Sequence, residues 1–331
     1  MRIIVDAMSG DNGPREIIAG AVTGAKESGA ELVLTGDENI INGIIAKEKM
    51  DCSNVKICAA GSVISMDDDA FSVVKSKSDS SMSVGLNLLK DGVGDAFVSA
   101  GNTGALLLGS SLILKRSKGV KRAAIGTVLP FTKPLLLLDS GANTEASAKN
   151  LLQYAVMGTV YYKSMFGLDS PRVGLLNNGA ERTKGTPAYL EAYSLLEKES
   201  GINFVGNIEG RDIPFGTCDV LVCDGFTGNI VLKLCEGFGS FLTLELKKAI
   251  MSSLTSKIGG FLIRKEVSAM KRRLDSTEYG GAPMLGISMP VIKAHGASGE
   301  KAIKNAFRQA CSFAAGGIPM KIETAVAPIA D

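Results

Sequence analysis

Five short apolar runs of the chain end in clusters of glycine, asparagine, aspartate and serine. The clusters are Ser99–Gly104, Asp139–Asn143, Asn177–Gly179, Gly206–Gly210 and Asp224–Asn229. Small residues let backbone N–H groups and helix N-termini approach an anion closely. Any one such cluster taken alone is better explained as an ordinary turn or loop. Five of them together favour a shared anion-binding site.

These clusters need a scaffold that brings them to one place. Short apolar runs without alternation are typical of strands buried on both faces, and stretches of helical composition follow most of them. The expected strands occupy residues 2–6, 31–35, 55–59, 95–99, 123–128, 134–139, 172–177, 203–208 and 219–223. The expected covering helices occupy residues 145–166, 186–199 and 298–314. This alternation predicts an α/β fold with a doubly wound, largely parallel sheet, whose carboxyl edge would carry all five clusters.

Composition limits the class of protein. The chain has 331 residues, 45% of them hydrophobic, and no linker or repeat divides it, so we expect one large α/β domain over residues 1–331. Its apolar stretches are too short to span a bilayer and no secretory signal begins it, so we expect a cytosolic protein. Six cysteines form no C-x-x-C pair and no ligand spacing with the one histidine, which favours reduced thiols.

Residues 230–276 differ from the rest of the chain. Apolar side chains recur there at helical spacing, and the pair Gly259-Gly260 is expected to break the helix into a hairpin. From Lys247 to Arg273 there are eight basic residues and one acidic residue, a net charge of +7 in a chain whose total is +2. The remainder of the chain therefore carries −5. Such a concentration of positive charge attracts acidic proteins, anionic lipid or nucleic acid.

Two uses of this hairpin follow from its composition. Its helix faces are expected to form a dimerisation bundle. An apolar tip surrounded by cations fits insertion into anionic lipid, although the tip could instead pack against the same protein or a second subunit. The residues expected at the tip and around it are Leu254, Ile258, Phe261, Leu262, Ile263, Arg264, Lys265, Lys271, Arg272 and Arg273.

Six segments of the chain, in their order and spacing, resemble one protein family. They are Val5–Asp11, Ser99–Ala105, Leu138–Asn143, Gly206–Asp212, Cys223–Asn229, and Gly280–Gly286 followed by Ala294–Gly296. Together they are similar to the phosphate acyltransferases of bacterial phospholipid synthesis, the acyl-[acyl-carrier-protein]:phosphate acyltransferases. The resemblance implies a three-layer α/β/α fold similar to phosphotransacetylases and isocitrate dehydrogenases, in a homodimer on the inner face of the cell membrane.

The resemblance also implies an activity. A long-chain acyl group would pass from acyl carrier protein to inorganic phosphate, without a cofactor, and a downstream glycerol-3-phosphate acyltransferase would use the acyl phosphate. The family's catalytic lysine and asparagine fall on Lys184 and Asn229. We expect Lys184 to hold phosphate and Asn229 to donate to phosphate or to the thioester oxyanion. The other residues expected to bind phosphate or substrate are Asp6, Gly10, Asp11, Ser99, Gly101, Asn102, Thr103, Gly104, Asp139, Gly141, Asn143, Asn177, Asp224, Gly228 and His295.

Phosphate is already an anionic nucleophile and a thioester is already activated. The site therefore needs positioning and charge stabilisation rather than a serine or cysteine nucleophile. Backbone N–H groups of Gly101–Gly104 and Gly141–Asn143 are expected to complete an anion cradle. The chain departs from the family pattern at Ser9, where Gly is usual, at Asn12, where His is usual, and at Ser140, where Val is usual. No histidine is thus present at position 12 to act as a general base.

Several of these residues have plainer explanations. A lysine in a polar loop is usually a solvated charge, and Asn229 could simply cap a helix. The aspartates could orient loops, and we assign no metal to them. His295 could protonate the departing thiolate or could hold the loop Gly280–Gly286.

Other functions are open as well. A short-chain phosphotransacetylase would use coenzyme A thioesters, and a non-catalytic membrane scaffold would need the basic segment but not Lys184. A nicotinamide dehydrogenase fits the sheet, but no G-x-G-x-x-G stands between a strand and a helix. No nucleic-acid-binding motif accompanies the basic segment.

Overall fold

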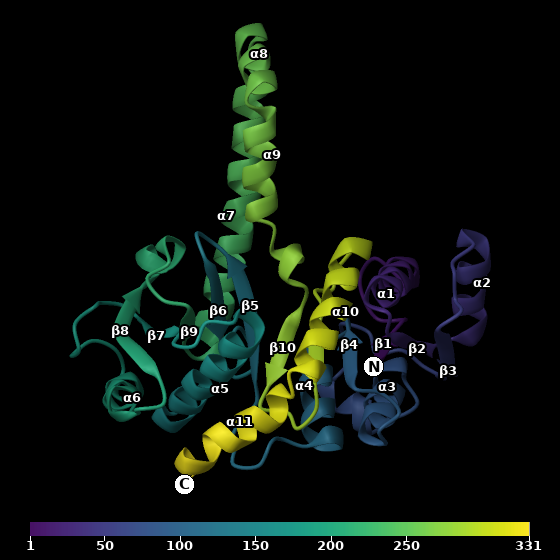
Figure 1. The fold of residues 1–331 in the computed structure, drawn as a ribbon, viewed down its shortest axis with the longest axis horizontal. Helices are drawn as coiled ribbons and strands as arrows, with labels where there is room; N and C mark the ends of the chain where they lie inside the picture. The colour runs from purple at the N-terminus through teal and green to yellow at the C-terminus, as the bar shows by residue number, and fades with distance from the viewer. Residues whose placement is uncertain (331) are drawn as a thin grey trace.

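The computed structural model describes residues 1–330, so Asp331, the last residue of the expected domain, lies outside the described residues. The strands form one 11-stranded sheet in the order β3-β2-β1-β4-β11-β10-β5-β6-β9-β7-β8 (Figure 1). Their bounds are β1 Arg2–Asp6, β2 Glu31–Gly36, β3 Val55–Ala59, β4 Ala96–Ser99, β5 Ala124–Pro130, β6 Pro134–Leu138, β7 Arg172–Asn177, β8 Asn203–Glu209, β9 Val220–Val222, β10 Ala282–Leu285 and β11 Val291–Lys293. Each expected strand is present, with its ends within two residues of the predicted bounds.

Two central strands, β10 and β11, were not predicted. They are four and three residues long, too short for a run of apolar residues to indicate a strand. Only the pairing of β10 with β5, and of β11 with β4, places them in the middle of the sheet.

The sheet consists of two parallel groups that run in opposite directions. β3, β2, β1, β4 and β11 are parallel to one another. β6, β9, β7 and β8 form a second parallel group. Between them the pairs β11–β10, β10–β5 and β5–β6 are all antiparallel, so the direction reverses three times. The carboxyl ends of the two groups therefore leave the sheet in opposite directions.

Helices cover both faces of the sheet, which confirms the doubly wound, three-layer α/β/α prediction. One face is covered by α1 Pro14–Ser28, α2 Glu38–Glu48, α5 Ala148–Phe166, α6 Pro187–Lys198, α10 Glu300–Ala315 and α11 Ile318–Val326. The other is covered by α3 Ser81–Lys90, α4 Thr103–Gly109 with its π-helical continuation Ser110–Leu114, and the beginning of α7 Gly225–Met251. Short 3₁₀ helices lie at Ala70–Val74, Gly210–Phe215, Ser276–Tyr279 and Ala327–Ile329.

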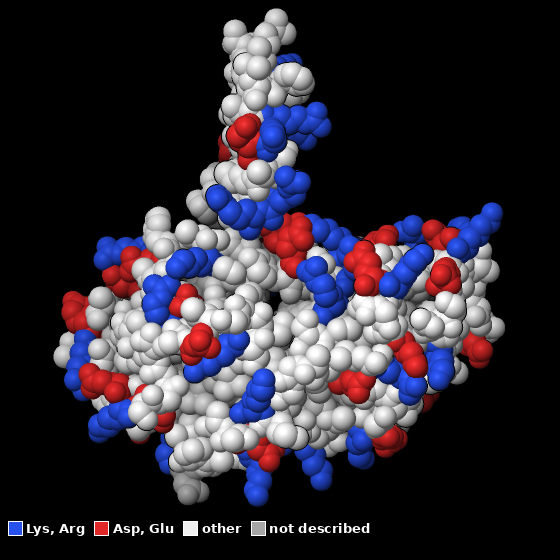
Figure 2. All heavy atoms as spheres, viewed as in Figure 1, with Lys and Arg blue, Asp and Glu red and all other residues white. Residues whose placement is uncertain are grey.

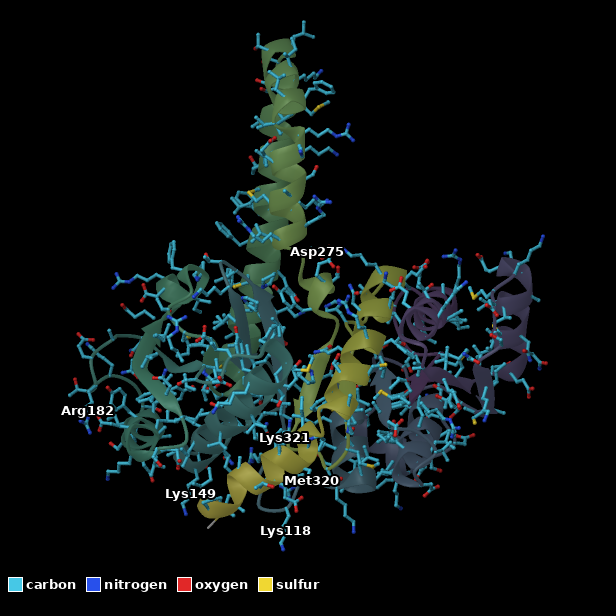
Figure 3. The ribbon with its side chains drawn as sticks, in the orientation of Figure 1. Lys118, Lys149, Arg182, Asp275, Met320 and Lys321 are labelled. Atoms are coloured by element: carbon cyan, nitrogen blue, oxygen red, sulfur yellow. The ribbon has the colours of Figure 1, made fainter. Side chains whose placement is uncertain are left out.

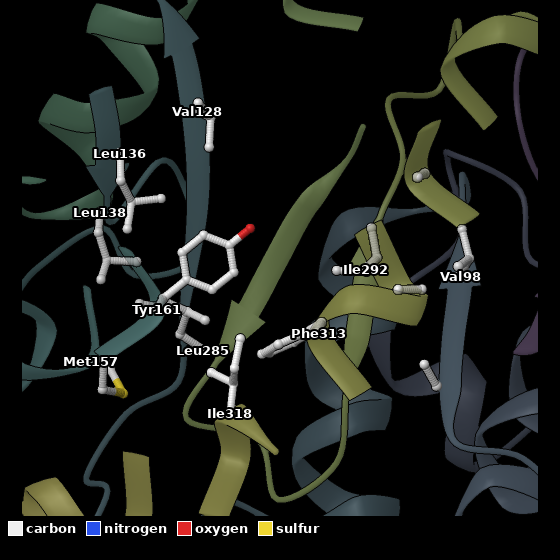
Figure 4. Packing of buried hydrophobic residues seen from close by; sticks show 14 of the residues in the cluster. Val98, Val128, Leu136, Leu138, Met157, Tyr161, Leu285, Ile292, Phe313 and Ile318 are labelled. Atoms are coloured by element: carbon white, nitrogen blue, oxygen red, sulfur yellow. The ribbon is translucent and has the colours of Figure 1, made fainter. Parts of the chain in front are cut away.

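The core follows the alternation of strand side chains. Ile3 and Val5 of β1 pack under α1 and its neighbours, whereas Ile4 packs under α3 on the opposite face. The first of these clusters is continuous across both strand groups, since it includes residues of β1, β4, β6 and β9. Tyr161 of α5 and Phe313 of α10 meet edge to face within it, with ring centroids 5.9 Å apart (Figure 4). The two halves of the sheet thus share one core.

A helical hairpin protrudes from the body, as predicted. α7 is 27 residues long, and α8 Leu254–Leu262 and α9 Arg264–Arg273 return along it (Figure 1). The predicted break at Gly259-Gly260 is wrong, because both glycines lie inside α8. The chain turns before α8 instead, at Ser252-Ser253, where the Ser253 side chain accepts the Ser256 N–H at 3.0 Å and caps α8. Gly260 instead allows close packing, since a Cβ there would lie 2.4 Å from the Ile250 side chain.

The tip of the hairpin is apolar and exposed. Leu254 is 77% exposed, Leu262 74% and Phe261 73%. In Figure 2 the top of the hairpin is mostly white, with a little blue behind it, and more basic side chains lie further down the hairpin. Because α9 runs back toward the body, Lys271, Arg272 and Arg273 lie at its body end and not around the tip, contrary to expectation. Among residues 1–330, no helix is both long and apolar enough to cross a membrane.

Candidate active site

Three polar loops meet at one edge of the second strand group. They follow β6, β9 and β7, which are adjacent and parallel. The loop after β6 begins at Asp139, α7 begins after Asp224 at the end of β9, and the loop after β7 carries Lys184. Together with the Gly206–Gly210 cluster, which ends the adjacent parallel strand β8, four of the five clusters predicted from sequence therefore lie at this edge.

Asp139 organises the loop that follows it. Its buried carboxylate accepts the N–H groups of Gly141, Ala142 and Asn143 at 3.0, 2.9 and 2.8 Å. Burial raises the pKa of Asp139, and these hydrogen bonds oppose the rise. The expectation that this loop cradles phosphate with its N–H groups is wrong, because Asp139 already accepts all three. The Asn143 amide is also committed, since it donates to Asp139 and to the carbonyl oxygen of Ala123.

The beginning of α7 packs directly on this loop. The Gly225 N–H donates to the Asn143 carbonyl oxygen at 2.7 Å, and the Asp224 carboxylate caps the helix through the Thr227 N–H at 2.8 Å. A Cβ at Gly228 would lie 1.9 Å from the Asp139 carbonyl oxygen, so only glycine fits there. Asn229 follows, and a Cβ added at Gly141 would lie 3.5 Å from its Cβ.

The loop after β7 carries Lys184. The Asn177 amide donates to the Lys184 carbonyl oxygen at 3.1 Å, and Gly185 has a φ of +102°, which favours glycine. Arg182 of this loop lies at the outer margin of the second half (Figure 3) and pairs with Glu197 at 2.7 Å. Within residues 1–330, neither the Lys184 ammonium nor the Asn229 amide has a hydrogen-bond partner, and both residues are exposed. These two groups are therefore free to bind a ligand.

Tyr189 connects the Lys184 loop to α7, and sequence reasoning missed it. Its hydroxyl donates to the Asp224 carboxylate, and its Cβ lies 2.9 Å from where a Cβ at Gly185 would be. Burial, together with the Asp224 hydrogen bond, raises the pKa of Tyr189, so it remains a neutral donor. Its one sequence signal is its place three residues after Thr186, at the beginning of α6.

Cys223 stands beside these residues but does not act as a nucleophile. It is fully buried, and its thiol donates to the Asp139 carbonyl oxygen at 3.6 Å. Burial, and then the neighbouring Asp224 and Asp139, raises the pKa of this thiol well above its ordinary value. It stays protonated at neutral pH.

The remaining predicted residues gather at the carboxyl ends of β1, β4 and β11. The Ser99 hydroxyl donates to Asp6 at 2.7 Å and accepts the Gly101 N–H at 3.1 Å. The Asp11 N–H donates to the Gly296 carbonyl oxygen at 2.8 Å. Gly10 belongs to the same contact, since a Cβ there would lie 3.3 Å from that oxygen.

Four other predicted residues of this group lie in the turns and helix that follow these strands. The Asn102 side chain caps α4 through the Ala105 N–H and donates to the Met66 carbonyl oxygen at 3.0 Å. Thr103 and Gly104 are exposed in the first turn of that helix. The His295 Nδ1 accepts the Ala297 N–H at 3.1 Å. His295 therefore bonds within its own turn rather than to the loop Gly280–Gly286.

The expectation of one shared edge is wrong. β4 runs opposite to β6, β9 and β7, so the cluster after Ser99 leaves the other end of the sheet from Asp139. Antiparallel pairing at the centre, which the sequence pattern did not reveal, separates the two groups. The second residue missed from sequence is Lys293, a buried lysine in the β4 group. Its one sequence signal is its position as a polar residue that ends the apolar run of β11.

Comparison with known proteins decides the family. A family model described as "Fatty acid synthesis protein" matches residues 1–321. Curated proteins named "Phosphate acyltransferase" from Thermoanaerobacter pseudethanolicus and Acetivibrio thermocellus are 47% and 45% identical to the chain, each over 95% of it and 93% of the relative. The chain belongs to the phosphate acyltransferase family. The resemblance inferred from six motifs is thus confirmed, as is the prediction that this family member is an acyltransferase.

Solved structures agree with this family member in fold. A phosphotransacetylase from Streptococcus pyogenes matches with a TM-score of 0.64 at 17% identity, over 95% of this chain and 94% of that one. The EutD phosphotransacetylase from Staphylococcus aureus matches with a TM-score of 0.59 at 16% identity, with the same coverage. These likenesses confirm the phosphotransacetylase-like fold and, at such low identity, nothing more.

Proposed function

We propose that the chain transfers a long-chain acyl group from acyl carrier protein to inorganic phosphate and releases acyl phosphate for phospholipid synthesis. Family membership supports this reaction. The structural observation that carries it is the placement of Lys184 on the loop after β7 and of Asn229 in the first turns of α7, which follows the neighbouring strand β9. Their polar groups have no partner among residues 1–330, whereas the polar groups around them bind one another. A ligand that is anionic and accepts hydrogen bonds satisfies both.

The chemistry follows from these two groups. A phosphate oxygen attacks the thioester carbonyl carbon, so a C–O bond forms as the C–S bond breaks. The proton of the attacking hydrogen phosphate passes to the departing thiolate, which leaves as the free thiol. Lys184 binds phosphate and offsets the charge that develops, and the Asn229 amide donates to phosphate or to the thioester oxyanion. Neither step requires a covalent enzyme intermediate or a cofactor.

The hairpin holds the enzyme at the cell membrane. The exposed apolar tip, Leu254 to Ile263, inserts into the inner face of the cell membrane, with Arg264 and Lys265 beside it at the start of α9. Lys271, Arg272 and Arg273 lie nearer the body, where they attract the acidic carrier protein. The enzyme is then a cytoplasmic protein held peripherally at the membrane, where the downstream glycerol-3-phosphate acyltransferase takes its product.

The exposed apolar face of α7 joins two copies of the chain in a homodimer. Along α7, Leu234, Phe238, Phe241 and Leu242 are each more than half exposed, which is costly for a helix that stands in water. Phe238 and Phe241 stack, with ring centroids 6.3 Å apart. A second copy that packs its α7 against this face would bury these side chains.

One assay tests the reaction and its main alternatives. Purified protein is incubated with phosphate and a long-chain acyl carrier protein, and free carrier thiol and acyl phosphate are measured together. We expect both to appear in equal amounts. Preference for a short-chain coenzyme A thioester would favour a phosphotransacetylase instead. A membrane scaffold would release neither product, and its function would depend on Lys271, Arg272 and Arg273 but not on Lys184.

A further inference from the structure

Lys293 is a buried ammonium group that joins two loops. It ends β11 opposite Ser99 of β4 and is only 8% exposed. Its Nζ donates to the carbonyl oxygen of Ala100 at 3.3 Å and to that of Ala294. Ala100 follows β4 and Ala294 follows β11, so one side chain links two of the loops that leave this end of the sheet.

Each bonded carbonyl sets the orientation of a neighbouring residue. Because a peptide unit is planar, the Ala100 carbonyl and the Gly101 N–H are fixed together, and so are the Ala294 carbonyl and the His295 N–H. Gly101 and His295 both belong to the predicted substrate-binding set. An ammonium group that holds these two peptide planes therefore controls how the loops present their backbone to a ligand.

The loop after β1 depends on the same arrangement. The Asp11 N–H donates to the Gly296 carbonyl oxygen at 2.8 Å, and the Asn12 amide donates to the Ala297 carbonyl oxygen at 2.9 Å. Both bonds are made to the turn that begins immediately after Ala294. A shift of that turn would move all three loops.

The protonation of Lys293 depends on charged groups of β1, of the loop after β1 and of α7. Burial lowers the pKa of Lys293 to about 8, and Lys233 of α7 contributes to this lowering. Lys233 lies four residues after Asn229 on α7, so the helix that carries Asn229 passes near these loops, although they leave the opposite end of the sheet from Asp139. Asp11 and Asp6, from the loop after β1 and from β1 itself, oppose it. The ammonium form is therefore the main form at neutral pH and is lost as the pH rises through about 8. Loss of the charge weakens both hydrogen bonds, because charge-assisted bonds are roughly twice as strong as neutral ones.

We propose that protonated Lys293 is a positioning residue that holds the loops after β1, β4 and β11 in the arrangement that binds phosphate. This inference rests on the proposed function. It predicts a defect in phosphate binding more than in turnover. It also predicts that wild-type activity falls at alkaline pH as the ammonium group loses its proton.

Three variants test the proposal: Lys293→Met, Lys293→Gln and, as a matched control, Lys321→Met on the exposed surface of α11 (Figure 3). The KM for phosphate and kcat are measured from about pH 6 to about pH 9 with acyl carrier protein thioester as donor. We expect Lys293→Met to raise the KM about tenfold with a smaller change in kcat. Lys293→Gln keeps N–H donors without the charge, so its KM should be intermediate. Both should lack the alkaline decline in kcat/KM that the wild type and Lys321→Met share.

The outcomes separate the two proposals. A Lys293→Met enzyme with the wild-type KM, or with the wild-type alkaline decline, overturns the role of Lys293. If thermal unfolding shows that Lys293→Met does not fold, Lys293→Gln and the wild-type profile decide. A wild type without an alkaline decline near pH 8 then overturns the role. A wild type that forms no acyl phosphate at any pH contradicts the proposed function instead.

Discussion

Tyr189 and Asp224 are hydrogen-bonded in both directions, although they lie 35 residues apart in the chain. The Tyr189 hydroxyl donates to the Asp224 carboxylate, and the Asp224 N–H donates back to that hydroxyl at 3.0 Å. Tyr189 lies in the first turn of α6, next to the Lys184 loop, and Asp224 caps the helix that carries Asn229. This pair therefore ties together the two segments that carry the groups that we assign to catalysis.

Removal of the Tyr189 hydroxyl should impair catalysis more than stability. We expect Tyr189→Phe to lower kcat/KM about tenfold, because a small displacement of reacting groups is costly in rate. Steady-state acyl phosphate formation measures this. Tyr162→Phe is the control, since its hydroxyl donates to the Pro134 carbonyl oxygen at 2.8 Å, in a contact with none of the site residues. Equal activity of the two variants would argue against a positioning role for Tyr189.

Lys184→Ala and Asn229→Ala should each lose most of the activity. The loss of one group that stabilises developing charge lowers kcat by about 100-fold or more. The measurement is acyl phosphate formation by variants whose circular dichroism matches the wild type. Lys118→Ala, an exposed lysine at the far end from the hairpin (Figure 3), should behave as the wild type. Near wild-type turnover in both site variants would refute the assignment.

Gly228→Ala should disrupt the contact between α7 and the Asp139 loop. Its Cβ would lie 1.9 Å from the Asp139 carbonyl oxygen, so the helix must move away from β6. We expect a loss of unfolding free energy of about 2 kcal/mol or more, and little remaining activity. Gly43→Ala, in α2 with nothing within 4 Å of its added Cβ, should instead stabilise by up to about 1 kcal/mol. Urea unfolding compares the two, and a tolerated Gly228→Ala would contradict the packing described.

The hairpin tip should control membrane binding without affecting the chemistry. Phe261→Asp places a charge on a side chain that is 73% exposed at the tip. We expect it to lose most sedimentation with anionic phosphatidylglycerol vesicles while it retains acyl transfer from soluble carrier protein. Met320→Asp alters a side chain that is 77% exposed on α11, and it should sediment as the wild type does (Figure 3). Unchanged sedimentation of Phe261→Asp would exclude the tip as the membrane contact.

Arg172 should stabilise the fold in a pH-dependent way. Burial raises the pKa of Asp219, but hydrogen bonds from Arg172, at 2.9 Å for the closest guanidinium pair, more than offset this, and the net pKa is lowered. The contribution of Asp219 is therefore present above its unfolded pKa and is lost as the pH falls through the folded one. We expect Arg172→Met to lose about 2 kcal/mol near neutral pH and progressively less below about pH 4.

Chemical unfolding at several pH values checks this, with Arg15→Met as the control. Arg15 pairs with Glu48 at 3.0 Å on the surface, where its side chain is 52% exposed, so its loss should cost less than about 1 kcal/mol. A pH-independent loss in Arg172→Met would show that packing, and not the charge pair, stabilises this position.

Local sequence was sufficient for the strands and for the family. Runs such as Leu135–Leu138 are buried on both faces, so their apolar character alone indicates a strand. Short polar motifs at strand ends were specific because several occurred together in order. Lys184 and Asn229 were identified in this way, through the family, and not from any local physical signal.

Tertiary contacts determined which segments of the chain lie next to one another. The three antiparallel pairs around β10 reverse the sheet, so clusters that look equivalent in sequence leave it at different ends. The N–H groups after Asp139 are used by that residue's own carboxylate, while Tyr189 and Lys293 acquire their roles from partners distant in the chain. Such roles depend on burial and on direction in space. Residue type and spacing encode neither of these, because each arises only when separate segments pack together.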